Sequence, residues 1–258
     1  MRIFAVSDLH TDFRENRLLL EQLSRVEYTQ DVLLVAGDIA DRLEVIGETL
    51  AFLRSRFARV FYTPGNHELW TRDEGCDSVE KYFRVIELCE RVGVSTSPGK
   101  QQGVRIVPLR SWYETKRGAD GRPEGPEEWA DFYFCRWPDR IKSPSAYFLE
   151  MNEPHVRSYD EPVVSLSHFL PRPDLLPPVE KLRFKRLPEV SICEPLEAQI
   201  RRLGSAVHVF GHSHINCDVR LDGVRYVQHA LRYPRERKGL CELVKLVWGE
   251  GTVAAARA

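Results

Sequence analysis

The chain has 258 residues, of which 43% are hydrophobic and 29% charged, as is usual for a globular protein with a sizeable core. This composition excludes disorder of the whole chain, because disordered chains carry too few apolar residues to form a core. The formal net charge of −1 argues against broad electrostatic capture of long nucleic acid or of a membrane surface.

The first hundred residues alternate short apolar runs with helical patterns. Apolar runs typical of buried parallel strands occupy residues 3–6, 32–36 and 60–62. Apolar residues recur with helical spacing over residues 16–26, 44–56 and 78–92. This βαβαβ order predicts a parallel sheet with helices packed on its faces.

The second half of the chain continues with strands and one clear helix. Strands are predicted at 104–107, 163–166 and 206–210, and a helix at 194–203. The pair Asp222-Gly223 predicts a two-residue turn that joins strands 217–221 and 224–228 in a hairpin. A last strand is expected at 240–247, followed by a frayed tail at 254–258.

A segment of unusual composition separates these parts, from Arg110 to Glu161. It is rich in glycine, proline and charge, yet it carries several aromatic side chains between Trp112 and Trp137. Structureless loops of this length are uncommon in compact domains. We therefore expect an ordered insertion, a lid or cap, within a single domain that spans residues 1–258. Its aromatic residues favour packing in a core, with a platform for base stacking as the alternative.

Side chains of the kinds that bind metal ions follow five of the predicted strands. The carboxyl ends of strands are where ligand sites form in open α/β sheets, so these clusters are expected to converge. Carboxylate, amide and imidazole groups suit divalent ions such as Mn, Fe or Zn. A shared carboxylate can hold two such ions roughly 3.5–4 Å apart. In chain order the clusters are Asp8-Leu9-His10, Gly37-Asp38, Gly65-Asn66-His67-Glu68, Ser167-His168 and Gly211-His212-Ser213-His214.

The motifs DLH, GDIAD, GNHE, SH and GHSH, in this order, resemble those of the calcineurin-like metallophosphoesterase family. The resemblance runs from Asp8 to His214 and is confined to the motifs. It implies an α/β fold, a four-layer αββα sandwich of two mixed β-sheets with a metal site at the carboxyl ends of the strands. It also implies a hydrolase of phosphate esters that works with two divalent metal ions.

The resemblance implies two overlapping sets of metal ligands, which share one carboxylate. A hydroxide that bridges the two ions would then attack the phosphorus atom. One ion is expected to be held by Asp8, His10, Asp38 and His214, and the other by Asp38, Asn66, His168 and His212.

Three further residues match positions with catalytic roles in the family. His67 matches a histidine that assists the leaving group or contacts the phosphate. Asp41 and Arg42 match a pair in the phosphoprotein phosphatase branch, in which the Asp orients that histidine and the Arg binds phosphate. Asn66 and Arg42 are thus expected to bind substrate. The chain departs from that branch at Leu43, where the branch has glycine, and its GHSH motif is closer to branches that act on small molecules and cyclic nucleotides.

These features favour a phosphatase that acts on a phosphorylated small molecule or a nucleotide. A phosphodiesterase acting on cyclic or oligonucleotide substrates is the first alternative. A non-catalytic metal-binding interaction module is the second, although such a module would be expected to have lost some ligands. A hydrolase of another bond is the third, because a fold does not fix a function. We expect neither a membrane nor long nucleic acid as a partner.

The remaining histidines and the cysteines are expected to be structural. His155, His208 and His229 do not follow a strand in the manner of the ligand clusters, whereas Glu68 is expected to hydrogen-bond groups near the ions. Six scattered cysteines without a CxxC pair predict reduced, mostly buried thiols. The sequence shows neither a signal peptide nor an apolar run of about 20 residues. We therefore expect a cytoplasmic protein, or an organellar one if a transit peptide was removed.

Overall fold

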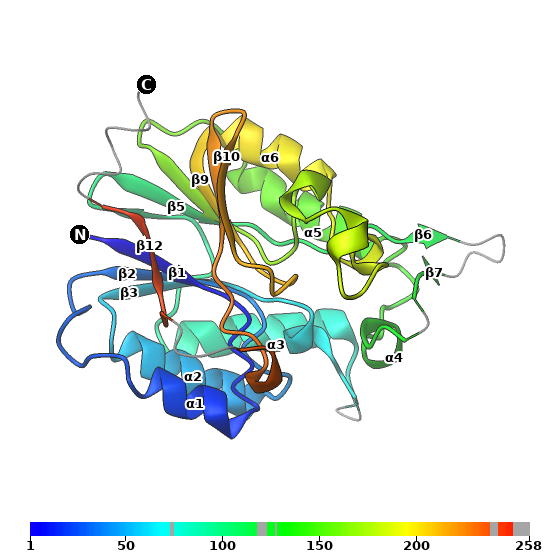
Figure 1. Ribbon diagram of the computed structural model, residues 1–258, viewed down its shortest axis with the longest axis horizontal. Coiled ribbons are helices and arrows are strands. Elements are labelled where there is room, and N and C mark those ends of the chain that lie inside the picture. The colour runs from blue at the N-terminus through cyan, green and yellow to red at the C-terminus, as the bar shows by residue number, and fades with distance from the viewer. Residues whose placement is uncertain (73–74, 118–122, 127, 238–241, 250–258) are drawn as a thin grey trace.

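Two mixed β-sheets lie face to face between two layers of helices in the computed structural model, which describes residues 1–72, 75–117, 123–126, 128–237 and 242–249 (Figure 1). Helices α1 (Arg14–Leu20), α2 (Leu43–Arg54) and α3 (Ser78–Arg91) cover the first sheet. Helices α5 (Pro144–Asn152) and α6 (Pro195–Leu203) cover the second. The predicted four-layer αββα sandwich is confirmed.

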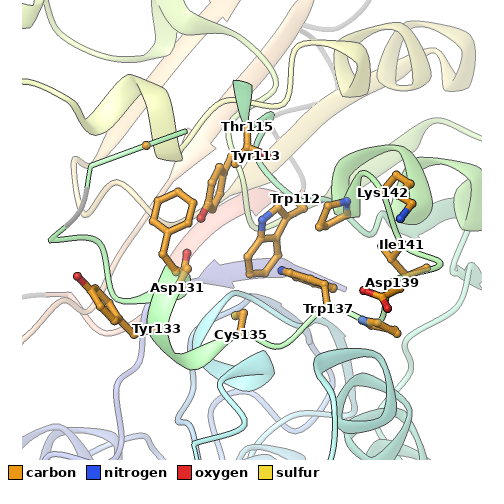
Figure 2. A pocket seen from close by; sticks show the side chains of 14 residues that line it. Trp112, Tyr113, Thr115, Asp131, Tyr133, Cys135, Trp137, Asp139, Ile141 and Lys142 are labelled. Carbon is orange, nitrogen blue, oxygen red and sulfur yellow. The ribbon is translucent and has the colours of Figure 1, made fainter. Parts of the chain in front are cut away.

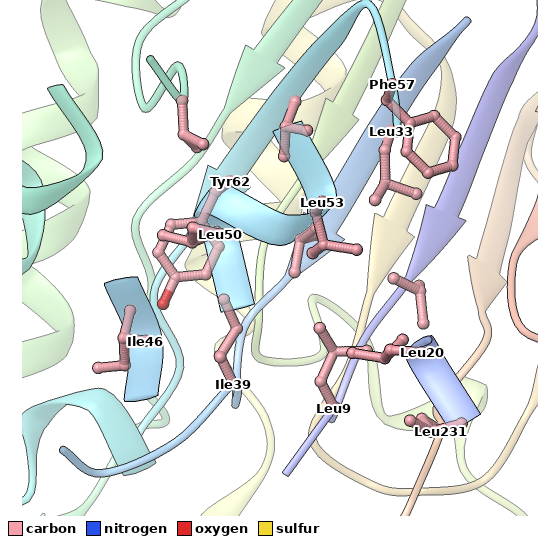
Figure 3. Close-up of a cluster of buried hydrophobic side chains, with 14 of the residues drawn as sticks. Leu9, Leu20, Leu33, Ile39, Ile46, Leu50, Leu53, Phe57, Tyr62 and Leu231 are labelled. Carbon is pink, nitrogen blue, oxygen red and sulfur yellow. The ribbon is translucent and has the colours of Figure 1, made fainter. Parts of the chain in front are cut away.

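The first sheet has the strand order β12-β1-β2-β3. Strands β1 (Ile3–Val6), β2 (Val32–Ala36) and β3 (Arg59–Thr63) are parallel, and β12 (Lys245–Trp248) is antiparallel at the edge. Successive side chains point to opposite faces of a strand, so alternate residues enter different clusters. Figure 3 shows the cluster on the helix side, where residues such as Leu33 of β2 meet side chains of α2 such as Leu50 and Leu53.

The second sheet has the strand order β10-β11-β9-β8-β5-β4. Its parallel strands are β5 (Val104–Pro108), β8 (Val163–Leu166), β9 (Ser205–Phe210) and β11 (Val224–Gln228), with β4 (Gly99–Gln101) and β10 (Cys217–Leu221) antiparallel at the edges. Asp222 and Gly223 both have positive φ, 46° and 87°, as a type I′ turn requires. The predicted hairpin between β10 and β11 is therefore confirmed.

A third cluster of apolar side chains fills the space between the sheets. The first sheet contributes Ile3, Leu34 and Phe61 among others, and the second contributes Val164 and Val209. These side chains are almost fully buried, so the two sheets are held together by a dry interface. The carboxyl ends of the parallel strands in both sheets lie on the same edge of the molecule, where Ser7 after β1 forms a parallel bridge with Ala230 after β11.

The boundaries of some elements differ from the predicted ones. Helix α1 ends at Leu20 and does not continue to residue 26, because the Ser24 hydroxyl accepts hydrogen bonds from the N–H groups of Val26 and Glu27 and closes a turn. The predicted last strand is shorter, as β12 begins at Lys245. Residues 240–241 of that prediction and the predicted tail at 254–258 lie outside the described residues.

The insertion from Arg110 to Glu161 contains the two-stranded sheet β6 (Lys116–Arg117) and β7 (Pro123–Glu124), helix α4 (Asp131–Phe134) and helix α5. Trp112, Tyr113 and Phe148 are buried in the cluster on the outer face of the second sheet. Several of the insertion's aromatic side chains thus belong to the core, as expected, whereas Tyr133 is exposed. Short 3₁₀ helices span His67–Leu69, Glu153–His155, Pro173–Leu175, Val179–Lys181, Leu187–Val190 and Pro234–Glu236. Among the described residues, no helix has the length and apolar character needed to cross a bilayer.

Candidate metal centre

The seven predicted metal ligands lie together just beyond the carboxyl ends of β1, β2, β3, β8 and β9. Six of them, together with His67, form groups in which each ligand atom lies within 4.8 Å of the others. Asp38 belongs to two of these groups, and His67 joins one of them. The groups are Asp8, His10 and His214; His10, Asp38 and His67; and Asp38, His168 and His212.

The first group joins the two sheets. Nε2 of His10 lies 3.0 Å from Nε2 of His214, and the latter lies 3.5 Å from Oδ1 of Asp8. Oδ1 of Asp8 also accepts a hydrogen bond of 2.9 Å from the backbone N–H of His212. The loop after β1 and the loop after β9 are therefore connected at this group.

The group of Asp38, His168 and His212 is deeply buried, and the amide of Asn66 lies beside it. Oδ1 of Asn66 lies 3.0 Å from both Nε2 of His168 and Nδ1 of His212. Nε2 of His168 lies 3.4 Å from Oδ1 of Asp38. The structure thus brings the residues of both predicted sets together, with Asp38 between them.

Hydrogen bonds on the far sides of two imidazole rings determine which nitrogen faces the centre. Nδ1 of His168 lies 2.9 Å from the carbonyl oxygen of Ala36, and Nδ1 of His214 lies 2.6 Å from the Glu236 carboxylate. An oxygen acceptor requires a proton on each Nδ1, so Nε2 of neutral His168 carries a lone pair. A partner of this kind is the usual support of a histidine that binds a metal ion. Burial opposes protonation of His214, but Asp8 and Glu236 raise its pKa to about 9, so its Nε2 must lose a proton before it binds a cation.

The chemistry of the donor set is suited to divalent cations. Nε2 of His168 lies 3.0 Å from Oδ1 of Asn66 and 3.4 Å from Oδ1 of Asp38, and all three atoms present lone pairs when Asp38 is ionised. Three acceptor atoms repel one another at this distance unless a cation lies among them. Nitrogen and oxygen ligands of these types suit Mn, Fe or Zn.

The electrostatics of the centre lead to the same conclusion. Burial lowers the pKa of His168, and it lowers those of His10 and His212 well below the usual value, which keeps these imidazoles neutral. Burial, together with the nearby charges of Glu68 and Asp8, raises the pKa of Asp38 well above its usual value. A bound cation would relieve this concentration of negative charge.

Five of the seven predicted ligands have a left-handed backbone. The φ angles are 52° at Asp8, 43° at His10, 57° at Asp38, 72° at His212 and 57° at His214. Each such residue costs on the order of 1–3 kcal/mol, and strain of this kind concentrates at functional sites. The strain is held in place by backbone hydrogen bonds between neighbouring loops, such as the 3.0 Å bond from the N–H of Asp8 to the carbonyl of Gly37.

Glu68 holds two of these loops together. Its buried carboxylate accepts backbone hydrogen bonds from Asp38 at 3.1 Å, Ile39 at 2.5 Å and Gly65 at 2.6 Å. It therefore links the ends of β2 and β3, in keeping with the hydrogen-bonding role expected from the sequence. Gly65 is required here, because a Cβ atom at this position would lie 2.2 Å from Oδ1 of Asp38.

His67 lies at the edge of the centre between two aromatic rings. Its ring centroid is 3.7 Å from that of Trp70, and its Nε2 lies 3.2 Å from the hydroxyl of Tyr233. Nε2 also lies 3.8 Å from Oδ2 of Asp38. His67 therefore lies beside Asp38, which belongs to both predicted ligand sets, and beside His10.

The Asp-Arg pair is placed differently from the arrangement that the resemblance implied. The carboxylate of Asp41 pairs with Nε of Arg72 at 2.6 Å. Among the described residues, no hydrogen bond joins Asp41 to His67; the group that contacts His67 is the hydroxyl of Tyr233. Arg42 is exposed at the start of α2 and does not line the clefts described below.

Two clefts of about 800 and 530 Å³ meet at His67, Trp70 and Tyr233. The larger contains Asp38 and Asn66, and three arginines are among its lining residues. No strand-end motif in the sequence marks these arginines, Tyr233 or the partners of the ligands, so sequence reasoning missed them. The missed residues are Arg183, Arg232 and Arg235 of the cleft, Tyr233 beside His67, Glu236 beside His214 and Asp131 beside Asn66.

The histidines expected to be structural lie outside the ligand groups formed by the described residues. His208 is buried in β9, where its two ring nitrogens hydrogen-bond the hydroxyls of Ser165 and Ser167. His229 lies beyond β11 and hydrogen-bonds the carbonyl of Glu242.

A family model, a curated relative and a solved structure all match this chain to phosphoesterases. The family model described as calcineurin-like phosphoesterase matches residues 1–216. The [acyl-carrier-protein] phosphodiesterase PptH of Mycobacterium tuberculosis is 30% identical over 261 residues, which cover 91% of this chain and 78% of PptH. The crystal structure of the phosphopantetheinyl hydrolase PptH from the same organism has a TM-score of 0.78 at 25% identity, and the match covers 97% of each chain.

Proposed function

Because the chain belongs to the calcineurin-like phosphoesterase family, we propose that it is a two-metal phosphodiesterase whose substrate is a phosphodiester carried by an acyl carrier protein. Membership of the family implies that the chain is a metal-dependent hydrolase of phosphate esters. The diester substrate is supported by PptH, which is matched over most of both chains. We take residues 1–258 as a single domain that carries an insertion at 110–161.

The observation that carries the proposal is that Asp38 shares one group of ligand atoms with His10 and another with His168 and His212. We assign the seven residues of the centre as ligands of two divalent ions, with Asp38 common to both. When bound, such ions act as Lewis acids on the phosphoryl group and lower the pKa of water. One set is Asp8, His10, Asp38 and His214, and the other is Asp38, Asn66, His168 and His212.

The remaining steps fall to side chains in the cleft. We assign to His67 the protonation of the leaving oxygen, and the Tyr233 hydroxyl, 3.2 Å from its Nε2, keeps the ring in place. Burial lowers the pKa of His67 well below its usual value, so the ring takes up this proton from water when the anionic substrate lies beside it. The guanidinium of Arg232 stabilises negative charge on the phosphoryl oxygens, and Asn66 acts through the metal ion that its amide oxygen would hold. Arg232 takes the role that the resemblance gave to Arg42, because Arg232 lines the cleft and Arg42 does not.

Arg232 has the properties of an anion-binding residue. Among the described residues, no carboxylate pairs with its guanidinium, and its Nε is buried without a hydrogen-bond partner. Its backbone is left-handed, with φ at 71°, and its N–H donates to the carbonyl of Asp8. A partly buried cation without a counter-ion is stabilised by an anionic substrate.

The first test combines elemental analysis of the purified protein with assays of bis-p-nitrophenyl phosphate, p-nitrophenyl phosphate and a phosphopantetheinylated acyl carrier protein. With added Mn²⁺ we expect about two metal ions per chain, faster hydrolysis of the diester than of the monoester, and release of the group from the carrier protein. Removal of the metal with a chelator should abolish all turnover. A protein that binds no metal and hydrolyses none of the three would contradict the proposal.

A monoester phosphatase is the second candidate. The cleft is lined by three arginines and by the carboxylates of Asp38, Glu128 and Glu236. Arg232 has no carboxylate partner among the described residues, and such a cation suits the dianionic phosphate of a monoester better than the single charge of a diester. A higher kcat/KM for p-nitrophenyl phosphate than for the bis ester would favour this candidate. The non-catalytic alternative is disfavoured, because such a module would be expected to have lost ligands and this chain retains all seven together with His67.

Arg232→Ala is expected to lower kcat/KM for bis-p-nitrophenyl phosphate by about 10- to 100-fold, because a hydrogen bond to a charged group contributes about 1.5–3 kcal/mol. Arg42→Ala is the matched control, since Arg42 is exposed and lies outside the cleft. It should leave kcat/KM within about twofold of wild type, a change of less than about 0.5 kcal/mol. The opposite pattern would restore Arg42 as the phosphate-binding residue.

A further inference from the structure

We propose that Asp131, which the insertion supplies, is a positioning residue that directs the amide oxygen of Asn66 toward the metal centre. This role depends on Asn66 being a metal ligand, as proposed above. Asp131 is the first residue of α4 and is only 3% exposed. It lies 65 residues after Asn66 in the sequence, in the part of the chain that shows no family motif.

The contact that carries the inference is a hydrogen bond of 2.8 Å from Nδ2 of Asn66 to Oδ1 of Asp131. An asparagine amide has its nitrogen and its oxygen on opposite sides. Anchoring the nitrogen on Asp131 therefore turns the oxygen toward His168 and His212, to which it lies at 3.0 Å. Without this anchor, rotation of the amide by about 180° would present an N–H group, which cannot bind a cation.

Two tryptophans complete the environment of the same carboxylate. Nε1 of Trp70 donates to Oδ1 of Asp131 at 2.6 Å, and Nε1 of Trp129 donates to Oδ2 at 2.9 Å. Trp70 packs against the ring of His67, and Trp129 contacts the ring of His212 at a centroid distance of 5.7 Å. Every one of these partners is a donor, which matches an ionised carboxylate because it only accepts hydrogen bonds.

The far side of Asp131 is fixed by the insertion itself. Asp131 also lines a pocket of about 550 Å³ that is separate from the two clefts at His67, together with Trp112, Tyr113 and Trp137. Figure 2 shows Asp131 beside Tyr113 at one side of this pocket, with Lys142 at the other. The carboxylate thus stands between the pocket of the insertion and the metal centre. The insertion is therefore part of the construction of the metal centre, in addition to any role as a cap.

The test is the affinity of the full-length, metal-free protein for Mn²⁺, measured by titration calorimetry. Asp131→Asn should weaken Mn²⁺ binding by about 10- to 100-fold, the loss usual for a residue that supports a metal ligand. The NH₂ group of the new asparagine cannot accept a hydrogen bond, yet it must face either Nε1 of Trp129 or the N–H groups of Asn66 and Trp70, which are all donors. Asp139→Asn, which removes an exposed carboxylate of the same insertion, should bind Mn²⁺ within about twofold of wild type.

Two further variants separate positioning from a general loss of structure. Trp129→Phe combined with Asp131→Asn removes the donor that opposes the new NH₂ group, so this double variant should recover part of the lost affinity. If the single variant does not fold, the double variant still tests the role, because it should bind Mn²⁺ more weakly than the wild type. In an Asn66→Ala background, Asp131→Asn should change the Mn²⁺ affinity by less than about twofold, because its effect passes through Asn66.

The outcomes distinguish this inference from the proposed function. A wild-type protein that binds no Mn²⁺, Fe²⁺ or Zn²⁺ would contradict the metal centre itself. If the wild type binds Mn²⁺, equal affinity in the Asp131→Asn protein would overturn the positioning role. An undiminished effect of Asp131→Asn in the Asn66→Ala background would overturn it as well, because Asp131 would then act on another ligand.

Discussion

Replacement of Asp38 by Asn is expected to remove bound metal and phosphoesterase turnover together. Asp38 belongs to two of the ligand groups, and its Oδ1 lies 3.4 Å from Nε2 of His168. An amide has one oxygen in place of two and carries no charge, so it cannot serve both groups. We expect a fall from about two metal ions per chain to one or none. We also expect kcat/KM to fall by at least about 100-fold, because mutation of a residue that only supports a metal ligand already costs up to about 100-fold.

Elemental analysis and the diester assay, made on the same preparations, check this prediction. The matched control is Asp77→Asn. Asp77 caps α3, and asparagine is an equally good cap, so that variant removes a carboxylate without disturbing the fold. It should retain both metal content and turnover. Retention of two metal ions by Asp38→Asn would exclude Asp38 as the shared ligand.

The second prediction concerns His67, whose replacement by Ala should separate catalysis from metal binding. As the group that protonates the leaving oxygen, His67 is expected to contribute about 10²- to 10⁴-fold to kcat. The seven assigned ligands are untouched by this change, so metal content should stay near wild type. His67 also lies in one of the potential ligand groups, with His10 and Asp38, and the metal measurement therefore decides between the two roles.

A comparison of leaving groups makes this test more specific. The loss caused by His67→Ala should be smaller for p-nitrophenolate than for an alkyl leaving group, because an alkoxide depends much more on receiving a proton. Tyr233→Phe removes the hydroxyl that contacts Nε2 of His67, and we expect about a tenfold loss or less, with the same dependence on the leaving group. Loss of metal in His67→Ala, or equal losses for both leaving groups, would contradict the role of His67 as proton donor.

Much of the fold was predictable because apolar runs and helical spacing are local properties of the sequence. Strands such as Val163–Leu166 occupy the predicted residues, since a buried parallel strand is a continuous apolar run. The convergence of Asp8, Asp38 and His212 was also predictable, because parallel strands bring their carboxyl ends to one edge. The roles of these residues stay predictions until metal binding is measured.

The surroundings of the centre could not be predicted, because they depend on contacts between distant loops. Tyr233 and Asp131 lie outside the motifs, and nothing in their local sequence indicates that they contact His67 and Asn66. The partner of Asp41 illustrates the same point. The motif around Asp41 suggested a contact with His67, whereas the structure pairs it with Arg72, a residue with φ at 40° in a loop without periodicity.

The joining of the two sheets at the metal centre has a consequence for how the chain unfolds. His212 follows Asp8 by 204 residues, and these residues belong to loops of different sheets. Ions held between such residues would act as reversible cross-links that restrict the unfolded chain, much as a disulfide bond closes a long loop. Because the unfolded chain has no preformed site, the free energy of metal binding adds to the free energy of unfolding. Loss of metal would therefore lower the free energy of unfolding, while the apolar cluster between the sheets would still hold the two sheets together.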